Sequence, residues 1–234
     1  MATAAPGLSV VIPTYSRAEQ LDRCLHALLA QAVAPTEVIV VDDATPSGST
    51  PAVLERWKDR PTSFRLHVER LLRNGGPARA RNAGVKIATG TWVAFTDDDC
   101  EPEPGWVAAL QCAASGAGAK VAGIGGRVLP ATTGLVSEYM TMHRILEPPP
   151  SCSYLVTANC MYRRSVFESV GGFDERVRQP GGEDPGLSFM VTDAGHQLGF
   201  CPEAVVRHHY RESALDFLKT FYRYGRGVRL VVGR

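Results

Sequence analysis

The stretch WVAFTDDDCE, residues 92–101, joins an apolar run typical of a buried β-strand to three consecutive aspartates. Adjacent carboxylates repel one another, so the arrangement calls for a positive partner. Because residues i and i+2 of an extended chain point the same way, we expect Asp97 and Asp99 to converge while Asp98 faces elsewhere. Two hard carboxylate oxygens suit Mn²⁺ or Mg²⁺. The stretch therefore predicts a divalent-metal site at the end of a strand, with a solvated acidic loop as the alternative.

Outward from this stretch, strand patterns alternate with helical patterns along the first hundred residues. Strand patterns occupy residues 8–12, 37–41, 64–68 and 92–95, and helical patterns occupy residues 18–31, 51–58 and 78–88. The alternation predicts right-handed crossovers and a mostly parallel sheet with helices on both faces. In such sheets ligands bind outside the carboxyl ends of the strands. Polar residues follow three of the strands here: Thr14, Asp42–Asp43 and Asp97–Asp99.

The rhythm changes after residue 119. Less regular strand patterns occupy residues 120–129 and 154–162, and helical patterns occupy residues 135–146 and 164–172. No internal repeat and no long polar linker divides the sequence. We therefore expect one α/β domain over residues 1–234, whose central sheet becomes mixed in the second half.

Composition restricts the class of protein. The 234 residues carry a net charge of +1 and are 44% hydrophobic, which is typical of a globular protein and gives no reason to expect a nucleic-acid partner. Six scattered cysteines without a C-x-x-C pair fit reduced thiols. Residues 1–7 lack the basic and apolar regions of a signal peptide, and no apolar run approaches the roughly 20 residues of a membrane span. We expect a cytoplasmic protein.

The turn after the first strand, PTYSRAEQ at residues 13–20, excludes several nucleotide-binding classes. It has no glycine, whereas a dinucleotide-binding fold needs G-x-G-x-x-G there, and a sugar nucleotidyltransferase normally has a Gly-rich loop. A Walker loop and a G-x-S-x-G nucleophile elbow are absent from the sequence. An aspartyl phosphatase would place its D-x-D after the first strand rather than the fourth.

Six segments resemble, in order and spacing, those of the family 2 glycosyltransferases: VVIPTYSR (10–17), VVDDATPS (40–47), NGGPARARNAG (74–84), FTDDDC (95–100), VGGFDER (170–176) and GGEDPGLSF (181–189). The resemblance covers about residues 8–210. It implies the GT-A fold, in which a nucleotide-sugar-binding half, about residues 1–100, continues into an acceptor-binding half, about residues 101–234. It also implies transfer of a sugar from a nucleotide-diphosphate donor with inversion, using a divalent metal.

The resemblance makes Asp184 the catalytic base, because in the family the second acid of this Glu-Asp pair has that role. A positioned carboxylate can take the proton of an acceptor hydroxyl as the hydroxyl attacks the anomeric carbon. The alternative is an acid favoured by a helix N-terminus, which fits Glu183 better. The family often has an arginine or lysine a few residues later, where this sequence has residues 187–190, LSFM. A phosphate contact from that position is therefore not expected.

Donor binding is the role implied for five residues: Thr14, Asp43, Arg81, Asp97 and Asp98. In the family Asp97 would lie near the ribose, and Asp43 could accept an N–H of uracil or of guanine. Each assignment has a plainer alternative. Asp43 could be a turn residue or a helix cap, Thr14 a buried hydroxyl that bonds to backbone, and Arg81 a surface arginine.

Metal ligation is the role implied for Asp99, with His208 completing the site as the histidine of a V-x-H context. Adjacent residues of a strand point to opposite faces, so His208 and His209 cannot both be ligands. A structural histidine is the alternative. The resemblance also implies that Trp106 and residues 157–160, TANC, line the sugar and acceptor pocket.

The last segment, residues 213–234, mixes aromatic and aliphatic side chains with lysine and arginine. A basic amphipathic helix of this kind can rest on an anionic membrane surface, where a lipid-linked acceptor would be found. Alternatively, the helix packs against the domain and ends in a basic tail. The first possibility would place the protein at the inner face of a membrane.

Together these features predict an inverting glycosyltransferase that uses a nucleotide-diphosphate sugar, preferably a UDP-sugar. The acceptor would be a carbohydrate, a lipid-linked molecule or a small molecule. Two other functions fit the same fold: a non-catalytic module that binds sugar nucleotides, and a metal-dependent hydrolase of nucleotide sugars.

Overall fold

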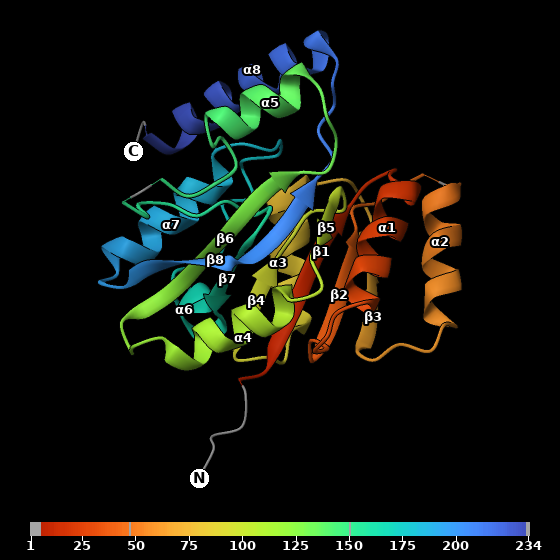
Figure 1. Cartoon of the computed structure of the whole chain (residues 1–234), viewed down its shortest axis with the longest axis horizontal. Coiled ribbons are helices and arrows are strands. Elements are labelled where there is room, and N and C mark those ends of the chain that lie inside the picture. The colour runs from red at the N-terminus through yellow and green to blue at the C-terminus, as the bar shows by residue number, and fades with distance from the viewer. Residues whose placement is uncertain (1–5, 47, 150, 233–234) are drawn as a thin grey trace.

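A computed structural model describes residues 6–46, 48–149 and 151–232 of the chain (Figure 1). Residues 1–5, from which the absence of a signal peptide was largely predicted, lie outside the described ranges. Arg234, the last residue of the predicted basic tail, also lies outside them. The first half contains β1 (Leu8–Thr14), α1 (Ala18–Leu29), β2 (Glu37–Asp42), α2 (Ser49–Lys58), β3 (Arg65–Arg70), α3 (Pro77–Ile87) and β4 (Trp92–Phe95). The second half contains β5 (Cys100–Pro102), α4 (Trp106–Gly116), β6 (Val121–Pro130), α5 (Leu135–Met142), β7 (Cys160–Arg163), α6 (Arg164–Ser169), α7 (Glu183–Asp193), β8 (Gln197–His208) and α8 (Ala214–Val232).

The central sheet has the strand order β3-β2-β1-β4-β7-β6-β8-β5. Strands β1 to β4 pair in parallel, as the alternating pattern predicts. The second half is mixed, because β7 is antiparallel to both β4 and β6, β5 is antiparallel to β8, and β6 and β8 are parallel. The predicted α/β fold with a mixed, mostly parallel sheet is confirmed.

Strands β1, β2 and β4 are buried along their whole length because helices cover both faces of the sheet. Successive residues therefore enter different cores. Val10 and Ile12 of β1 pack with α1, α2 and α4, whereas Val11 packs with α3 on the other face. Helix α3 approaches closely because Gly84 has no side chain, since a Cβ there would lie 2.5 Å from a methyl of Val11.

Several boundaries differ from the sequence prediction in the second half. The strand predicted at residues 154–162 is only β7, and the helix predicted at residues 135–146 ends at Met142. Residues 157–159 lie outside the sheet because the side chain of Asn159 fixes this segment. Its amide donates to the carbonyls of Arg127 and Ala204, both at 2.8 Å. Neither the short β5 nor α4 is predicted by periodicity, and β8 extends well beyond the strand-like run AVVR, residues 204–207, that precedes His208.

Helix α8 lies with α5 over the carboxyl ends of the strands (Figure 1). Its Gly227 packs on Gly181 and Gly182, where a Cβ would lie 1.5 Å from the Gly181 carbonyl oxygen. Phe221 and Tyr224 pack against the core from the same side. One face of the helix therefore packs against the domain, as the second of the two predicted possibilities requires. Within the described residues, no helix combines the length and the apolarity that a bilayer span requires.

Candidate active site

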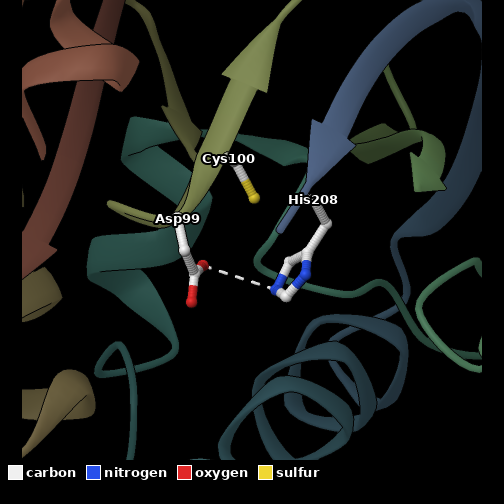
Figure 2. Close-up of side chains that lie close together, drawn as sticks. All are labelled: Asp99, Cys100 and His208. Carbon is white, nitrogen blue, oxygen red and sulfur yellow. Dashed lines mark ion pairs between the residues drawn. The ribbon is translucent and has the colours of Figure 1, made fainter. Parts of the chain in front are cut away.

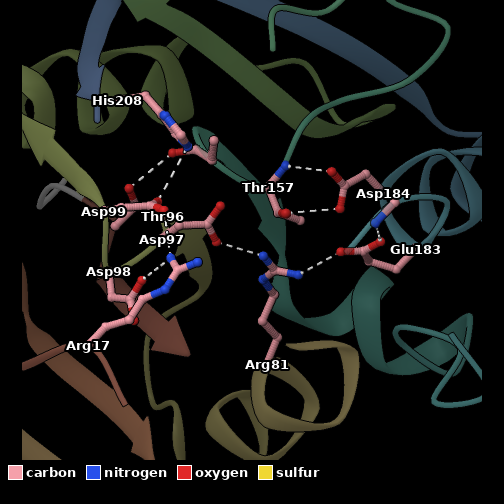
Figure 3. A network of polar contacts seen from close by, with 12 residues as sticks. Arg17, Arg81, Thr96, Asp97, Asp98, Asp99, Thr157, Glu183, Asp184 and His208 are labelled. Atoms are coloured by element: carbon pink, nitrogen blue, oxygen red, sulfur yellow. Dashed lines mark hydrogen bonds and ion pairs between the residues drawn. The ribbon is translucent and has the colours of Figure 1, made fainter. Parts of the chain in front are cut away.

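The three aspartates follow β4 at the carboxyl edge of the sheet, where each contacts a different set of residues (Figure 3). Asp97 bonds to Arg81 at 2.7 Å, and Asp98 accepts the hydroxyl of Thr14 at 2.8 Å. Asp98 and Asp99 share the guanidinium of Arg17, at 2.9 and 2.6 Å. The sequence predicted that Asp97 and Asp99 would converge. In the structure the two aspartates that share a partner are instead Asp98 and Asp99.

The reason for this difference is a turn. Asp98 and Asp99 lie in a turn that the Cys100 N–H closes by donating to the Asp97 carbonyl at 3.1 Å. The rule that residues i and i+2 point the same way holds for extended chains and fails in a turn.

Arg17, immediately before α1, is the positive partner that sequence reasoning missed. Burial raises the pKa of Asp98 to about 7, although Arg17 opposes the shift. Burial acts in the same direction on Asp99, but His208 and Arg17 outweigh it and hold the pKa of Asp99 below its usual value. The signal available in the sequence was the single basic residue in the PTYSR segment that follows the first strand.

Asp99 and His208 face each other because β5 pairs with β8 in the register Cys100 to His208 (Figure 2). The Asp99 Oδ1 lies 3.4 Å from the His208 Nε2 and has no hydrogen-bond partner although it is buried. His209 turns the other way and contacts Glu101 at 2.6 Å. The structure thus brings His208, and not His209, to the acidic turn.

A divalent cation fits this pair, because a buried carboxylate oxygen without a partner stands beside an imidazole nitrogen. In the described part of the chain, Asp99, Cys100 and His208 form a group whose potential ligand atoms all lie within 4.8 Å of one another. Burial raises the pKa of the Cys100 thiol well above its usual value. The thiol therefore stays protonated, and the Asp99 carboxylate and the His208 imidazole are the candidate ligands.

Arg81 is buried, so the alternative of a surface arginine is wrong. It bridges Asp97 of the acidic turn, at 2.7 Å, and Glu183 at the start of α7, at 3.2 Å. The other oxygen of Glu183 accepts the Gly181 N–H at 2.6 Å. Glu183 is buried and begins α7, so it is an acid at a helix N-terminus, as the alternative supposed, and also the partner of Arg81.

Asp184 follows in the first turn of α7 and is held by Thr157 (Figure 3). The Thr157 hydroxyl donates to one carboxylate oxygen at 2.9 Å, and the Thr157 N–H donates to the other at 3.3 Å. Burial, reinforced by the charge of Glu183, raises the pKa of Asp184 to about 8. A carboxyl with this pKa can exchange a proton near neutral pH.

Asp42 ends β2 and Asp43 follows it, and the two carboxylates have different partners. Asp42 is the turn residue, since it accepts the Thr45 N–H at 2.9 Å. Asp43 accepts the N–H groups of Gly75 and Gly76 at 2.8 and 2.7 Å, and burial raises its pKa. Each of its oxygens keeps a lone pair, so Asp43 can hold the loop before α3 and still accept a ligand.

A cavity of about 440 Å³ joins most of these residues. Its wall includes all seven of the predicted donor and metal residues, together with Arg17 and side chains of α8: Thr14, Arg17, Asp43, Arg81, Asp97, Asp98, Asp99, His208, Phe217, Thr220, Phe221, Arg223 and Tyr224. Asp184 is absent from the wall. Burial raises the pKa of the Tyr224 phenol, and the charges of Asp184 and Asp97 add to the shift, so Tyr224 stands near both acids.

The pocket-lining roles expected for Trp106 and residues 157–160 are wrong. Trp106 is fully buried and donates its indole N–H to Asn159 at 2.8 Å. Residues 157–160 are buried as well. Trp106 and Asn159 fix the loop from inside the core, and Thr157 then orients Asp184, so their contribution to the site is indirect.

Comparison with known proteins gives one family model and relatives named as glycosyltransferases. The family model described as glycosyl transferase family 2 matches residues 9–171. A glycosyltransferase of Haloferax volcanii, AglE, is 28% identical over 232 residues, which are 97% of this chain and 74% of that protein. The pre-mycofactocin glycosyltransferase of Mycobacterium tuberculosis is 31% identical over 231 residues, 92% of this chain and 46% of that protein. The chain thus spans about half to three quarters of the length of these relatives.

Two solved structures share the fold. The mannosyltransferase PcManGT from Pyrobaculum calidifontis, in complex with GDP-Man and Mn²⁺, superposes with a TM-score of 0.73 at 21% identity, over 97% of this chain and 65% of that one. GalNAc-T7 with UDP, GalNAc and Mn²⁺ gives a TM-score of 0.70 at 18% identity, over 97% of this chain and 48% of that one.

Proposed function

The chain belongs to glycosyltransferase family 2 and has the GT-A fold, and from this we propose that it is an inverting glycosyltransferase that uses a nucleotide-diphosphate sugar. The observation that carries the proposal is the cavity at the carboxyl edge of the sheet. Its wall unites the acidic turn with Asp43, Arg81 and His208, which come from four separate segments of the chain. A fold needs no such concentration of charge, whereas recognition of a phosphorylated sugar does.

We assign the nucleotide end of the donor to the part of the cavity near Asp43. Its free lone pairs can accept an N–H of uracil or of guanine, and we propose a UDP-sugar as the donor to test first. Thr14 and Asp98 form one hydrogen-bonded unit beside Arg17, and Arg17 and Arg81 supply positive charge at the acidic turn. The two fold neighbours contain GDP-Man and UDP respectively, so the fold accommodates either base.

A divalent metal, Mn²⁺ or Mg²⁺, would be held by Asp99 and His208. When bound, it would neutralise charge on the diphosphate leaving group. Both fold neighbours contain Mn²⁺, which supports a metal of this class. Arg17 adds a second positive charge at the same carboxylates, so this chain itself contributes to balancing the charge.

We assign the general base to Asp184. In a single displacement the acceptor oxygen forms a bond to the anomeric carbon while the bond from that carbon to the diphosphate oxygen breaks, which inverts the configuration. The hydroxyl proton moves to a carboxylate oxygen of Asp184, which Thr157 holds in place. Asp184 is not in the wall of this cavity, but it is half-buried rather than enclosed, and Tyr224 of the cavity wall stands near it.

The metal assignment predicts different effects for the two adjacent histidines. His208→Ala removes the imidazole beside Asp99, so the Mn²⁺ concentration needed for half-maximal binding of a UDP-sugar should rise by about 10- to 100-fold. His209→Ala removes a side chain that contacts Glu101 and should have a much smaller effect. Isothermal titration of the UDP-sugar at a series of Mn²⁺ concentrations measures both.

Treatment of the wild type with EDTA is the control, and it should abolish donor binding until Mn²⁺ or Mg²⁺ is restored. Full donor binding after thorough chelation would rule out the metal. A larger effect of His209→Ala than of His208→Ala would show that the assignment of the ligand is wrong.

A further inference from the structure

Exposed apolar side chains concentrate on α5 and α8. Of the eleven large hydrophobic residues that are exposed in the described part of the chain, seven lie on these two helices: Leu135, Tyr139, Met142, Leu215, Leu218, Tyr222 and Val228. Their exposed fractions run from 40% for Tyr139 to 84% for Leu135. We call these seven residues the α5–α8 platform. Such a concentration on a folded domain marks an interaction surface.

The two helices lie side by side (Figure 1), and contacts between their side chains join them. The Tyr139 ring of α5 contacts the rings of Phe217 and Phe221 of α8, with centroids 5.1 and 6.0 Å apart. Glu212, two residues before α8, accepts the N–H groups of Val136 and Ser137 at the start of α5, at 3.0 and 3.2 Å. These contacts fix the orientation of α5 relative to α8.

The charge of α8 indicates the kind of partner. The helix has one acidic residue, Asp216, and four basic ones: Lys219, Arg223, Arg226 and Arg229. In the structure as described, none of the four basic side chains forms an ion pair. Lys219, Arg226 and Arg229 are exposed, and they recur at helical spacing with Leu215, Leu218 and Tyr222. Apolar and basic side chains on one exposed stripe complement a surface that offers both acyl chains and anionic headgroups.

The opposite faces of the same two helices form part of the active-site wall. Val136 and Met140 of α5 and Phe217, Phe221 and Tyr224 of α8 line the cavity. A molecule that lies at the platform is therefore separated from the cavity by the thickness of one helix layer. The platform and the catalytic site are two sides of one structural unit.

We propose that the α5–α8 platform docks on a bilayer that contains anionic lipids, and that the acceptor is lipid-linked and reaches the cavity from this surface. The assignment of the acceptor rests on the proposed function, whereas the docking does not. Leucine, methionine and tyrosine of the platform enter the headgroup and acyl boundary, and the arginines and the lysine contact anionic headgroups.

Co-sedimentation of the full chain with vesicles tests the docking. Wild-type protein should bind vesicles of phosphatidylglycerol and phosphatidylcholine, bind vesicles of phosphatidylcholine alone much more weakly, and dissociate as salt is raised. Leu218→Asp should lower the partition coefficient by at least about tenfold, because an exposed apolar side chain of the platform is replaced by an anion. The matched control is Leu72→Asp, since Leu72 is fully exposed away from the platform.

A second pair of variants tests the charge. Arg226→Glu should lower the partition coefficient by about 5- to 30-fold, because it changes the local charge by two. Lys58→Glu makes the same charge change at an exposed basic residue of α2. It should leave the partition coefficient within about twofold of the wild-type value. Unchanged vesicle binding in both platform variants would overturn the proposal.

Two further readouts separate this inference from the proposed function. Light scattering measures oligomeric state, and a dimer that Leu218→Asp dissociates would overturn the proposal by showing that the platform binds a second copy. Binding of a UDP-sugar with Mn²⁺, measured without vesicles, should be unchanged in Leu218→Asp. Donor binding without any vesicle binding would refute the docking alone, whereas vesicle binding without donor binding would refute the proposed function alone.

Discussion

Asp184→Asn is expected to lower the rate of sugar transfer by about 10²- to 10⁴-fold, the usual contribution of general-base catalysis. Asparagine keeps the size of the side chain and can still bond to Thr157, whose hydroxyl and N–H hold Asp184. It cannot accept a proton. Binding of the donor and of Mn²⁺ should therefore stay close to wild type, because Asp184 does not line the cavity. Transfer assays and donor titration on the same preparation measure the two effects.

The pH profile gives the same prediction an independent readout. With a pKa of about 8, Asp184 is mostly protonated below pH 8 and cannot act as a base. The wild-type kcat/KM should therefore rise about tenfold per pH unit towards pH 8 and then level off. Asp184→Asn should lack this rise. Asp193→Asn, the same change at the exposed end of α7, is the control and should keep the wild-type rate and profile.

Stability should also respond to pH with a definite sign. The folded pKa of Asp184 lies above its ordinary value of 3.8, so the protonated form is the one that stabilises the fold. That contribution is present below pH 3.8 and is lost as the pH rises through about 8. The melting temperature of Asp184→Asn should therefore fall less between pH 6 and 9 than that of the wild type. Transfer within a few-fold of wild type would contradict the base assignment, and loss of donor binding would point instead to a phosphate or metal role.

Arg81→Met should destabilise the fold by roughly 3–5 kcal/mol, the usual cost of removing one member of a buried ion pair. Methionine keeps the aliphatic length but leaves the carboxylates of Asp97 and Glu183 without their cation. Glu183 carries most of the cost because it is buried, whereas Asp97 is partly exposed to solvent. Denaturant unfolding measures the free energy of unfolding. Arg79→Met on the same helix is the control, since Arg79 forms no ion pair with a described residue. This substitution should change the free energy of unfolding by less than about 1 kcal/mol.

A second substitution separates the charge from the packing. Adding Glu183→Gln to Arg81→Met removes the unpaired buried charge, so the double variant should recover part of the lost stability. A double variant that is less stable than Arg81→Met alone, or a single variant within about 1 kcal/mol of wild type, would show that the Arg81 bridge does not hold α3, the acidic turn and α7 together.

The first half of the fold could be predicted from the sequence because β1, β2 and β4 are mostly apolar runs and helical patterns alternate with the strands. Strands that are covered on both faces form apolar runs, which can be identified from the local sequence alone. Polar residues that follow these runs mark the carboxyl edge of the sheet. Thr14, Asp43 and Asp97 are found at that edge for this reason. The second half depends on pairings between distant strands, which periodicity does not encode.

Individual contacts at the site were less predictable for the same reason. Arg17 meets Asp98 and Asp99 only because β1 and β4 are neighbours in the sheet, and the partner of an arginine cannot be read from its own segment. The turn at Asp98 and Asp99 removed the alternation on which their expected orientation depended. The resemblance implied that His208 is a metal ligand. The pairing of β5 with β8, which places His208 rather than His209 beside Asp99, could be seen only in the structure.

The central claim is that the cavity binds a nucleotide-diphosphate sugar together with a divalent metal. Thermal or denaturant unfolding of the wild type with UDP-, GDP- and dTDP-sugars, each with and without Mn²⁺, tests it most directly. A UDP-sugar with Mn²⁺ at about 100 times its Kd should stabilise the protein by roughly 2.7 kcal/mol, and the effect should vanish without the metal. Unchanged stability with all three donors in the presence of Mn²⁺, at concentrations that saturate a site of this class, would contradict the account.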